Sequence, residues 1–381
     1  MINVKTEPVK VLYFVDRMLR GGIQSLVIDW VSRFDKSKIH VDFLLLDDGK
    51  EYDLEQTLKD LGCTVYKLKG IWVKTPIDFI KYKNAVKNFF KEHHDYKVVH
   101  MHSSSKNYMI LKYAKKYGIP IRIAHSHNID FQTKNPLKKL IGNVFKKPLI
   151  KYATDYFACS KIAGEWLFGK KIVVSDKFKV IHNAIDFNKF KYDENVREEI
   201  RKEFSVKNNE ILFGNVGRFS NQKNHLFLLN IFNEIFRMNS NAKLILVGQG
   251  ENEQIIRKMI ENLNIKDKVI FAGFRNDVNK IMQGIDVFIM PSLHEGLPVV
   301  GIEAQAAGIP CFMSKDVITS EVKIIDSLKF ISLNNNAKFW AKEILNSNLN
   351  RTNSYHQLKA AGYFIEDTIA ILEKEYLKNK D

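Results

Sequence analysis

The sequence predicts an α/β protein with two doubly wound parallel sheets, and three observations support this fold class. Short runs of β-branched and aromatic residues alternate with amphipathic stretches, which is typical of parallel strands joined by crossover helices. The alternation starts a second time after Asn183-Ala-Ile-Asp186. The chain has 381 residues, of which 45% are hydrophobic, and this is enough apolar material for two cores. We therefore expect two domains.

The first series opens with a strand over residues 9–15, a turn at Gly21-Gly22 and a helix over residues 23–34. Ser160 is placed to cap a later helix. The other expected strands cover residues 40–46, 64–68, 98–101, 121–124 and 156–158, and the other expected helices cover residues 52–61 and 76–93.

The second series has the same order of elements, and Pro298 suits the start of a further helix. We place the linker near residues 184–195, the first domain at residues 1–187 and the second at residues 188–357. A long final helix over residues 355–377 is expected, and the segment from about 358 to 381 is long enough to return to the first domain. The expected strands are 211–216, 243–247, 269–272 and 287–290, and the helices are 225–238, 252–263 and 278–283.

The net charge of +16 is concentrated in the first half of the chain. Residues 1–190 carry +15 and the remaining residues carry +1. Such a charge favours an anionic partner: a phospholipid surface, a nucleic acid or a pyrophosphate-bearing substrate. A solvated lysine-rich surface is the alternative. Aromatic residues are not interleaved with the basic ones, which disfavours a nucleic-acid stacking platform.

Targeting signals are not evident in the sequence. No apolar run approaches the roughly 20 residues that cross a bilayer, and the first ten residues lack the apolar core of a signal peptide. Cys63, Cys159 and Cys311 are isolated, as expected for buried thiols in a reducing compartment. We expect a cytoplasmic protein.

Ligands of open α/β sheets bind beyond the carboxyl ends of the strands, so the loops there are the candidate sites. Gly21 and Gly22 let backbone N–H groups approach a phosphate, although such glycines are often only turn formers. Arg218 and Lys223, five positions apart before a helix, can form a diphosphate clamp; a solvated basic loop is the alternative.

Two carboxylates, Glu295 in a loop and Glu303 on the following helix, flank a Gly-Leu-Pro turn. Paired acceptors at one sheet edge suit the hydroxyl groups of a sugar and a ribose. An exposed helical Glu is usually only solvated, but Glu303 lies between Ile302 and Ala304.

Four histidines end two strands of the first domain as the pairs His100, His102 and His125, His127. Alternate residues of a strand share a face, so each pair points the same way. The spacing could ligate a metal, yet no Asp or Cys cluster accompanies it, and hydrogen-bonded core histidines are the alternative.

The Glu295 and Glu303 segment, with Gly-Leu-Pro after the first Glu and Glu-Ala-Gln-Ala at the second, resembles the retaining glycosyltransferases of family 4. The resemblance extends over nearly the whole chain. Within the family, the chain looks most like the bacterial exopolysaccharide and capsule subgroup. Its other motifs are Gly21-Gly22, Val99-His100-Met101-His102, Arg122-Ile-Ala-His125-Ser-His127-Asn128, Ala158-Cys159-Ser160, Val216-Gly217-Arg218-Phe219, Lys223-Asn224-His225 and Leu246-Val247-Gly248.

The resemblance implies the GT-B fold, with two Rossmann-like domains facing a cleft, and it implies roles for residues. Arg218 and Lys223 would bind the donor diphosphate, Glu303 the ribose and Glu295 the transferred sugar. The active-site histidine of the family maps to His125 or His127, and His127 is preferred. The remaining donor-binding residues implied are Gly21, Gly22, Phe274, Arg275, Gly296 and Leu297. Two departures are a missing Phe-Gly before Leu297 and Ala184 where Asn-Gly is commoner.

The activity implied is transfer of a sugar, with retention of anomeric configuration, from a nucleotide diphosphate donor such as a UDP-sugar. The acceptor would be a saccharide, and specifically a lipid-linked one at the inner face of the membrane. No D-x-D occurs, so no metal or other cofactor is expected. The alternatives are a sugar-nucleotide epimerase and a non-catalytic scaffold that binds anionic membranes or nucleic acid.

A basic and apolar segment over residues 134–151 is the candidate membrane contact. Lys138, Lys139, Lys146 and Lys147 lie among Leu137, Leu140, Ile141, Val144 and Phe145. This mixture suits a helix in the membrane interface, and a helix packed on its own domain is the alternative.

Overall fold

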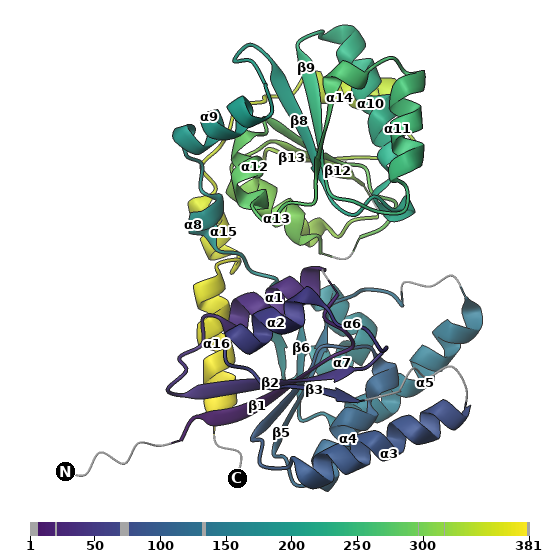
Figure 1. Ribbon diagram of the computed structural model, residues 1–381, viewed down its shortest axis with the longest axis vertical. Helices are drawn as coiled ribbons and strands as arrows, with labels where there is room; N and C mark the ends of the chain where they lie inside the picture. Colours follow the sequence, from purple (N-terminus) through teal and green to yellow (C-terminus); the bar gives the residue numbers. More distant parts are fainter. Residues whose placement is uncertain are drawn as a thin grey trace, which may run out of the picture. The chain divides into compact units, whose positions relative to one another are not determined.

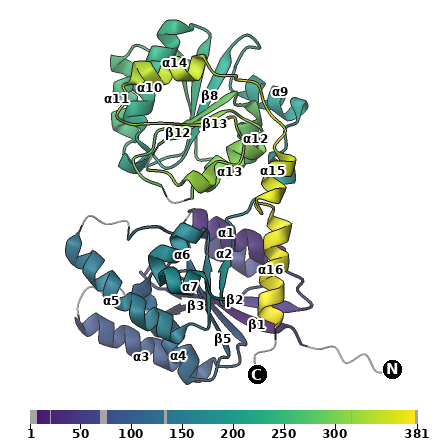
Figure 2. The ribbon, with the colours of Figure 1, turned by 180° about the vertical axis from the view of Figure 1, so that it is seen from behind.

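The computed structural model of the chain describes residues 7–19, 21–68, 76–131, 135–295, 297–315 and 317–378. It divides into two compact units, Met1–Asn183 with Glu366–Asp381, and Ala184–Ile365 (Figures 1 and 2). The first boundary lies four residues before the predicted one, and the segment that returns to the first unit begins at Glu366.

The first unit contains a parallel sheet with the strand order β3-β2-β1-β4-β5-β6-β7. Its strands are β1 (Val9–Val15), β2 (Ile39–Leu46), β3 (Val65–Leu68), β4 (Val98–Met101), β5 (Ile121–Ser126), β6 (Asp155–Ala158) and β7 (Phe178–Val180). Its helices are α1 (Gly22–Val31), α2 (Asp53–Asp60), α3 (Pro76–Glu92), α4 (Met109–Lys116), α5 (Pro136–Tyr152), α6 (Lys161–Phe168), α7 (Lys170–Val173) and α16 (Ile365–Leu377).

The second unit contains a parallel sheet with the order β10-β9-β8-β11-β12-β13. Its strands are β8 (Ile211–Val216), β9 (Ala242–Val247), β10 (Val269–Gly273), β11 (Val287–Met290), β12 (Cys311–Ser314) and β13 (Leu328–Ile331). Its helices are α8 (Phe187–Phe190), α9 (Glu194–Glu203), α10 (His225–Met238), α11 (Glu253–Asn262), α12 (Val278–Gly284), α13 (Val299–Ala306), α14 (Ala337–Leu345) and α15 (Tyr355–Ala360). The predicted pair of doubly wound sheets is therefore confirmed.

Alternation along the strands divides the first unit into two cores. Leu12 and Phe14 pack with α3 and α4 on one face of the sheet. Tyr13 and His100 lie on the other face, where Tyr13 contacts Tyr376 of α16 and Trp30 of α1 stacks on His125. Both ribbon views place α16 next to α1 (Figures 1 and 2). Ser160 caps α6, as predicted, by accepting a hydrogen bond from the backbone N–H of Ala163.

The prediction of one final helix over residues 355–377 is wrong. The chain forms α15 and α16 with a break between them, at which Gly362 has φ +76°. In this break Ile185 donates its N–H to the carbonyl of Tyr363 and accepts the N–H of Ile365. The bridge to Ile185 replaces helical hydrogen bonds, and a glycine adopts the left-handed conformation at low cost.

Each sheet has a switch point, at which the strand order reverses. It lies between β1 and β4 in the first unit and between β8 and β11 in the second. Loops at the carboxyl ends of these strand pairs diverge, so ligand sites are expected there.

Candidate functional site

At the switch point of the second unit, the loop after β8 and the loop after β11 are joined by hydrogen bonds. The backbone N–H of Leu293 donates to the carbonyl of Gln222 at 2.8 Å. The Gln222 side chain donates to the carbonyl of His294 at 2.9 Å, and the Asn224 side chain to that of Pro291 at 3.0 Å. These bonds hold the two predicted site loops side by side.

Lys223 and Glu295 form an ion pair within this junction. Lys223 Nζ lies 2.7 Å from Glu295 Oε1, and their side chains are only 16% and 10% exposed. A Cβ at Gly217 would lie 3.0 Å from Lys223 Cε, so this glycine makes room for the lysine stem. A carboxylate and an ammonium group therefore stand together at the edge of the sheet, where each can also contact a polar ligand.

Arg218 has a different environment from Lys223. Its guanidinium is largely exposed, and Nε donates to Glu251 Oε2 at 3.0 Å. Surface pairs of this kind contribute little to stability, so Arg218 can exchange Glu251 for an anionic ligand at small cost.

Glu303 lies on α13, one turn after the N-cap Pro298. Burial raises the pKa of its carboxyl group to about 7. Among the described residues, none is recorded as a hydrogen-bond or ion-pair partner of this carboxyl group. A desolvated carboxylate without a partner is a strong acceptor for ligand hydroxyl groups.

The loop after β9 packs closely on the loop after β8, a feature that the sequence analysis did not identify as part of the site. A Cβ at Gly248 would lie 2.1 Å from the Gly217 carbonyl oxygen, and Gly248 has φ +139°. A Cβ at Gly250 would lie 2.5 Å from the Phe219 carbonyl oxygen. Larger residues would push the Arg218 loop away; the signal in the sequence is the pair of glycines after a strand.

The loop after β10 holds Phe274 and Arg275. Phe274 is 46% exposed, which suits stacking or apolar contact with a ligand. The Arg275 guanidinium bonds to Asp277 at 2.7 Å and to Glu203. Its side chain therefore stabilises the loop, and a ligand at this position would contact the backbone. Leu297 is buried; Gly296 lies outside the described residues.

In the first unit, Gly21 and Gly22 begin α1. Gly21 is the N-cap residue, and among the residues that the structure describes no side chain caps this helix end. No atom would lie within 4 Å of a Cβ at Gly22. The N-terminal N–H groups are accessible there, as an anion site requires.

A polar cluster at the switch point of the first unit was missed by sequence reasoning. Asp16, which follows β1, accepts hydrogen bonds from Ser103 and, at 2.7 Å, from the side chain of Asn107. Lys106 Nζ lies 4.0 Å from Asp16 Oδ2. The only sequence signal was polar residues directly after β1 and β4. The half-exposed carboxylate is available to a hydroxyl-bearing ligand.

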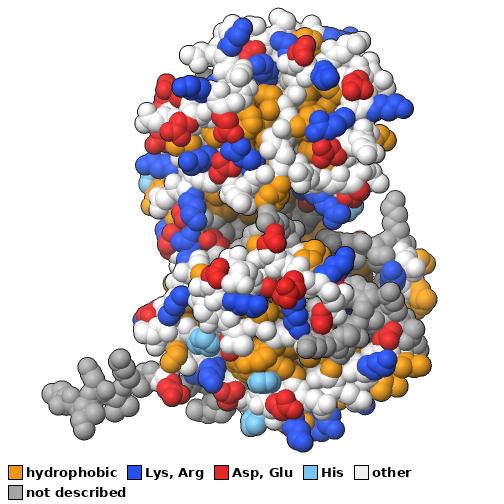
Figure 3. All heavy atoms as spheres, viewed as in Figure 1, with side chains coloured by type: hydrophobic (Ala, Val, Ile, Leu, Met, Phe, Trp, Pro, Cys, Tyr) orange, Lys and Arg blue, Asp and Glu red, His pale blue; other side chains and the backbone are white. Residues whose placement is uncertain are grey.

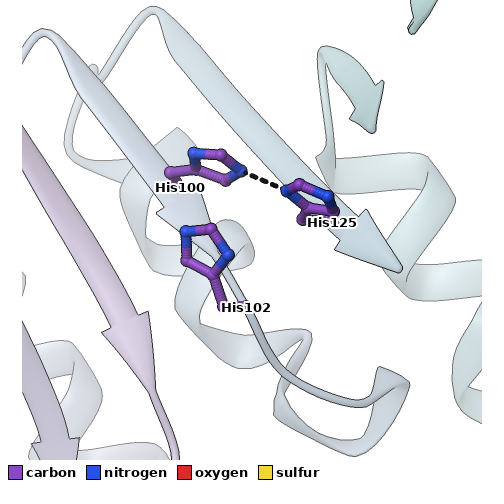
Figure 4. Close-up of side chains that lie close together, drawn as sticks. All are labelled: His100, His102 and His125. Atoms are coloured by element: carbon purple, nitrogen blue, oxygen red, sulfur yellow. Dashed lines mark hydrogen bonds between the residues drawn. The ribbon is translucent and has the colours of Figure 1, made fainter. Parts of the chain in front are cut away.

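The four histidines form one aromatic cluster between β4 and β5. His100 Nε2 lies 3.0 Å from His125 Nδ1 (Figure 4), and His102 Nδ1 lies 3.0 Å from His127 Nε2. His100, His102 and His125 offer ligand atoms within 4.8 Å of one another, an arrangement that could hold a metal ion. Both ring nitrogens of His100 are engaged in hydrogen bonds, the second with Tyr376.

His125 and His127 differ in accessibility. His125 is 1% exposed, whereas His127 is partly exposed. Burial lowers the pKa of both, and for His127 it lowers the pKa to about 4. Both imidazoles are neutral at pH 7, and His127 has the more exposed side chain of the two.

Two family models match the chain. The model described as Glycosyltransferase Family 4 matches residues 20–189, and the model described as Glycosyl transferases group 1 matches residues 196–363. The putative glycosyltransferase EpsF of Bacillus subtilis is 32% identical over 88% of this chain and 86% of its own. A UDP-Gal:alpha-D-GlcNAc-diphosphoundecaprenol alpha-1,3-galactosyltransferase of Escherichia coli is 29% identical over 70% of this chain and 72% of its own.

The fold is also similar to solved structures. The Anabaena protein HepE, crystallised with UDP and glucose, superposes with a TM-score of 0.75 over 97% of this chain and 100% of its own, at 18% identity. The two sheets and their switch-point loops thus define a GT-B glycosyltransferase. The chain belongs to the family-4 glycosyltransferases, as the sequence motifs indicated.

Proposed function

We propose that this glycosyltransferase moves a sugar from a UDP-sugar to a lipid-linked saccharide, with retention of anomeric configuration, during exopolysaccharide or capsule synthesis. The observation that carries the donor assignment is the Lys223–Glu295 ion pair at the switch point, together with the carboxyl group of Glu303 on the following helix, for which the described residues offer no recorded partner. Lys223 and Arg218 supply positive charge for the diphosphate, and the two acids accept sugar and ribose hydroxyl groups.

The proposed reaction needs no metal. The sequence has no D-x-D, and the positive charges of Lys223 and Arg218 can neutralise the leaving diphosphate. Within the described ranges, the side chains that could together hold a metal ion, those of His100, His102 and His125, lie in the first unit and include no carboxylate. The proposal that anomeric configuration is retained rests on the membership of this chain in the family-4 glycosyltransferases.

The acceptor assignment rests on relatives and on the first unit. The E. coli relative acts on a diphosphoundecaprenol-linked sugar. In this chain, Asp16 and its partners Ser103 and Asn107 offer polar contacts for an acceptor hydroxyl at the first switch point. In the described part of the chain, every helix is too short or too polar to span a membrane.

An exposed apolar face on α3 and α5 supports peripheral docking to an anionic membrane. Phe79 of α3 stacks on Phe145 of α5, so the helices lie together. Orange side chains gather over this part of the first unit (Figure 3). The face consists of Ile77, Ile80, Leu137, Leu140, Ile141 and Val144, each 44–65% exposed. Lys81, Lys83, Lys87, Lys138 and Lys147 are exposed nearby on the two helices.

Lys146 does not belong to this contact surface. Its Nζ donates to the Trp166 carbonyl at 2.6 Å and lies 4.4 Å from the Trp166 ring centroid. The α3–α5 face, as defined above, and its exposed lysines remain suited to an interface in which apolar side chains insert and lysines reach headgroups.

A panel of nucleotide sugars tests the proposed function through thermal unfolding. A ligand that binds only the folded protein raises its Tm. We expect stabilisation by UDP and one or more UDP-sugars, unchanged in excess EDTA, and release of UDP only as sugar is transferred or hydrolysed. No stabilisation by any nucleotide, or activity lost in EDTA and restored by Mn²⁺, contradicts the proposal. Conversion of a UDP-sugar to its epimer would show the alternative enzyme.

A further inference from the structure

A chain of buried hydroxyl and imidazole groups connects the C-terminal helix to the histidine cluster. The hydroxyl oxygens of Tyr13 and Tyr376 lie 2.6 Å apart. Tyr376 Oη lies 2.6 Å from His100 Nδ1, and His100 Nε2 lies 3.0 Å from His125 Nδ1. Tyr376 therefore connects α16 to His100 of β4, which in turn contacts the candidate active-site histidine His125 of the neighbouring strand β5.

The hydrogen bonds of this chain favour one direction. If Tyr13 donates to Tyr376, Tyr376 to His100 and His100 to His125, every hydroxyl proton has an acceptor and only His125 Nε2–H lacks a partner. In the reverse direction, the Tyr13 proton and the His125 Nε2 lone pair both lack partners among the described residues. Because unpaired buried polar groups are costly, the first direction is preferred. His125 is then the Nε2–H tautomer.

This tautomer has a consequence for His127. The ring of His125 stacks on that of His127, with centroids 4.1 Å apart, and Trp30 stacks on the other side of the cluster. His102 Nδ1 holds His127 Nε2 at 3.0 Å. The ring of His127 is thus held by a stack and a hydrogen bond, and the orientation of His125 determines the stack.

We propose that Tyr376 is a positioning residue: through His100 it fixes the tautomer and orientation of His125, which in turn supports His127. The catalytic consequence rests on the proposed function and on the family resemblance, which maps the active-site histidine to His125 or, by preference, His127. Tyr376 lies beyond both family matches, which end at residues 189 and 363. The proposal therefore adds a residue that those matches do not cover.

The tautomer is measurable on the protein alone. Long-range ¹⁵N–¹H spectra of histidine-labelled protein distinguish Nδ1–H from Nε2–H rings. We expect His125 as the Nε2–H form in wild type, a mixture of forms in Tyr376→Phe, and the wild-type form in Tyr13→Phe. Tyr13→Phe is the matched control, because it removes an equally buried hydroxyl but leaves the Tyr376 bond to His100. An unchanged His125 signal in Tyr376→Phe overturns the proposal.

Turnover separates positioning from stability. With the UDP-sugar that the thermal panel selects, Tyr376→Phe should lower kcat about tenfold and leave UDP affinity within about twofold, since misplacement affects the reacting geometry. Tyr13→Phe should stay within about threefold of wild type. Wild-type kcat in Tyr376→Phe, or equal losses in both variants, contradicts the positioning role.

Two further outcomes separate this proposal from the donor assignment and from a metal site at the histidine cluster. If His127→Ala transfers sugar like wild type, the catalytic part fails while UDP stabilisation and the donor assignment stand. If one equivalent of ZnCl₂ shifts the signals of His100, His102 and His125 and raises the Tm of wild type, the cluster is a metal site and the hydrogen-bond chain is overturned.

Discussion

Glu295 and Glu303 are carboxylates of the same segment, but their surroundings give them different chemistry. Glu295 is paired with Lys223, whereas Glu303 is desolvated and has a pKa of about 7. The raised pKa makes the protonation of Glu303 relevant near neutral pH. Only the ionised form offers two acceptors to ribose hydroxyl groups.

Affinity for the selected UDP-sugar should therefore rise roughly fivefold to tenfold between pH 6 and pH 8, as Glu303 ionises. The diphosphate diester itself has no pKa in this range. Glu303→Gln should bind more weakly at pH 8 and lose this pH dependence, whereas Glu295→Gln should keep it and impair turnover. Calorimetric titration of each protein with the UDP-sugar at pH 6 and pH 8 measures this dependence. If Glu303→Gln shows the same pH dependence as wild type, Glu303 is not the group that contacts the ribose.

The unliganded protein should show the opposite trend in stability. In the folded protein the pKa of Glu303 lies above its ordinary value of 4.5. Its stabilising contribution to the free energy of unfolding is therefore fully present below pH 4.5 and is lost as the pH rises through about 7. The free energy of unfolding of Glu303→Gln should lack this decline.

At the residue scale, the sequence predicted which side chains lie at the sheet edge but not their partners. Lys223 and Glu295 are 72 positions apart, and their pairing depends on how two loops pack. Asp16 was missed because a single acid after a strand has many ordinary explanations. Arg275 and Lys146 were assigned ligand contacts, yet tertiary contacts engage both cations.

Among the secondary-structure elements, the helices α3 and α5 form the surface that we propose docks on a membrane. We expect the protein to sediment with vesicles of phosphatidylglycerol but not of phosphatidylcholine alone, and less so as salt is added. Lys138→Glu with Lys147→Glu, or Leu140→Ser with Val144→Ser, should weaken sedimentation severalfold, because each removes charge or apolar area from the α3–α5 face.

Matched controls lie on α7 and next to it. Lys170→Glu with Lys171→Glu changes the same charge on an exposed helix, and Val174→Ser removes an aliphatic side chain that is 79% exposed. These variants should sediment like wild type. Wild-type protein that ignores anionic vesicles at low salt contradicts docking and leaves the transferase assignment intact.

Most strands and helices could be predicted because their periodicity is local. The strands 98–101, 211–216 and 287–290 agree with β4, β8 and β11 at both ends. The break between α15 and α16 could not be predicted in this way, because the bridge from Ile185 to Phe364 that interrupts the helical pattern is a long-range contact.

At the scale of the whole molecule, two doubly wound units each present a switch point, and each switch point has its own group of polar candidate residues. The doubling of the fold was predictable from the repeated alternation of elements. The charge asymmetry is a further whole-chain property, with +15 in the first 190 residues, and it suits a first unit that meets an anionic acceptor.

The central claim, that the switch point of the second unit binds a nucleotide diphosphate, is tested most directly by titrating UDP into wild type and two matched pairs of variants in EDTA. Lys223→Ala is compared with Lys243→Ala, whose lysine forms an equally buried pair with Glu210. Arg218→Ala is compared with Arg237→Ala, an exposed arginine paired with Glu234. We predict a Kd raised roughly tenfold or more in Lys223→Ala and Arg218→Ala, since each loses a charge-assisted contact, and a wild-type Kd in both controls. Wild-type affinity in Lys223→Ala and Arg218→Ala would contradict the account.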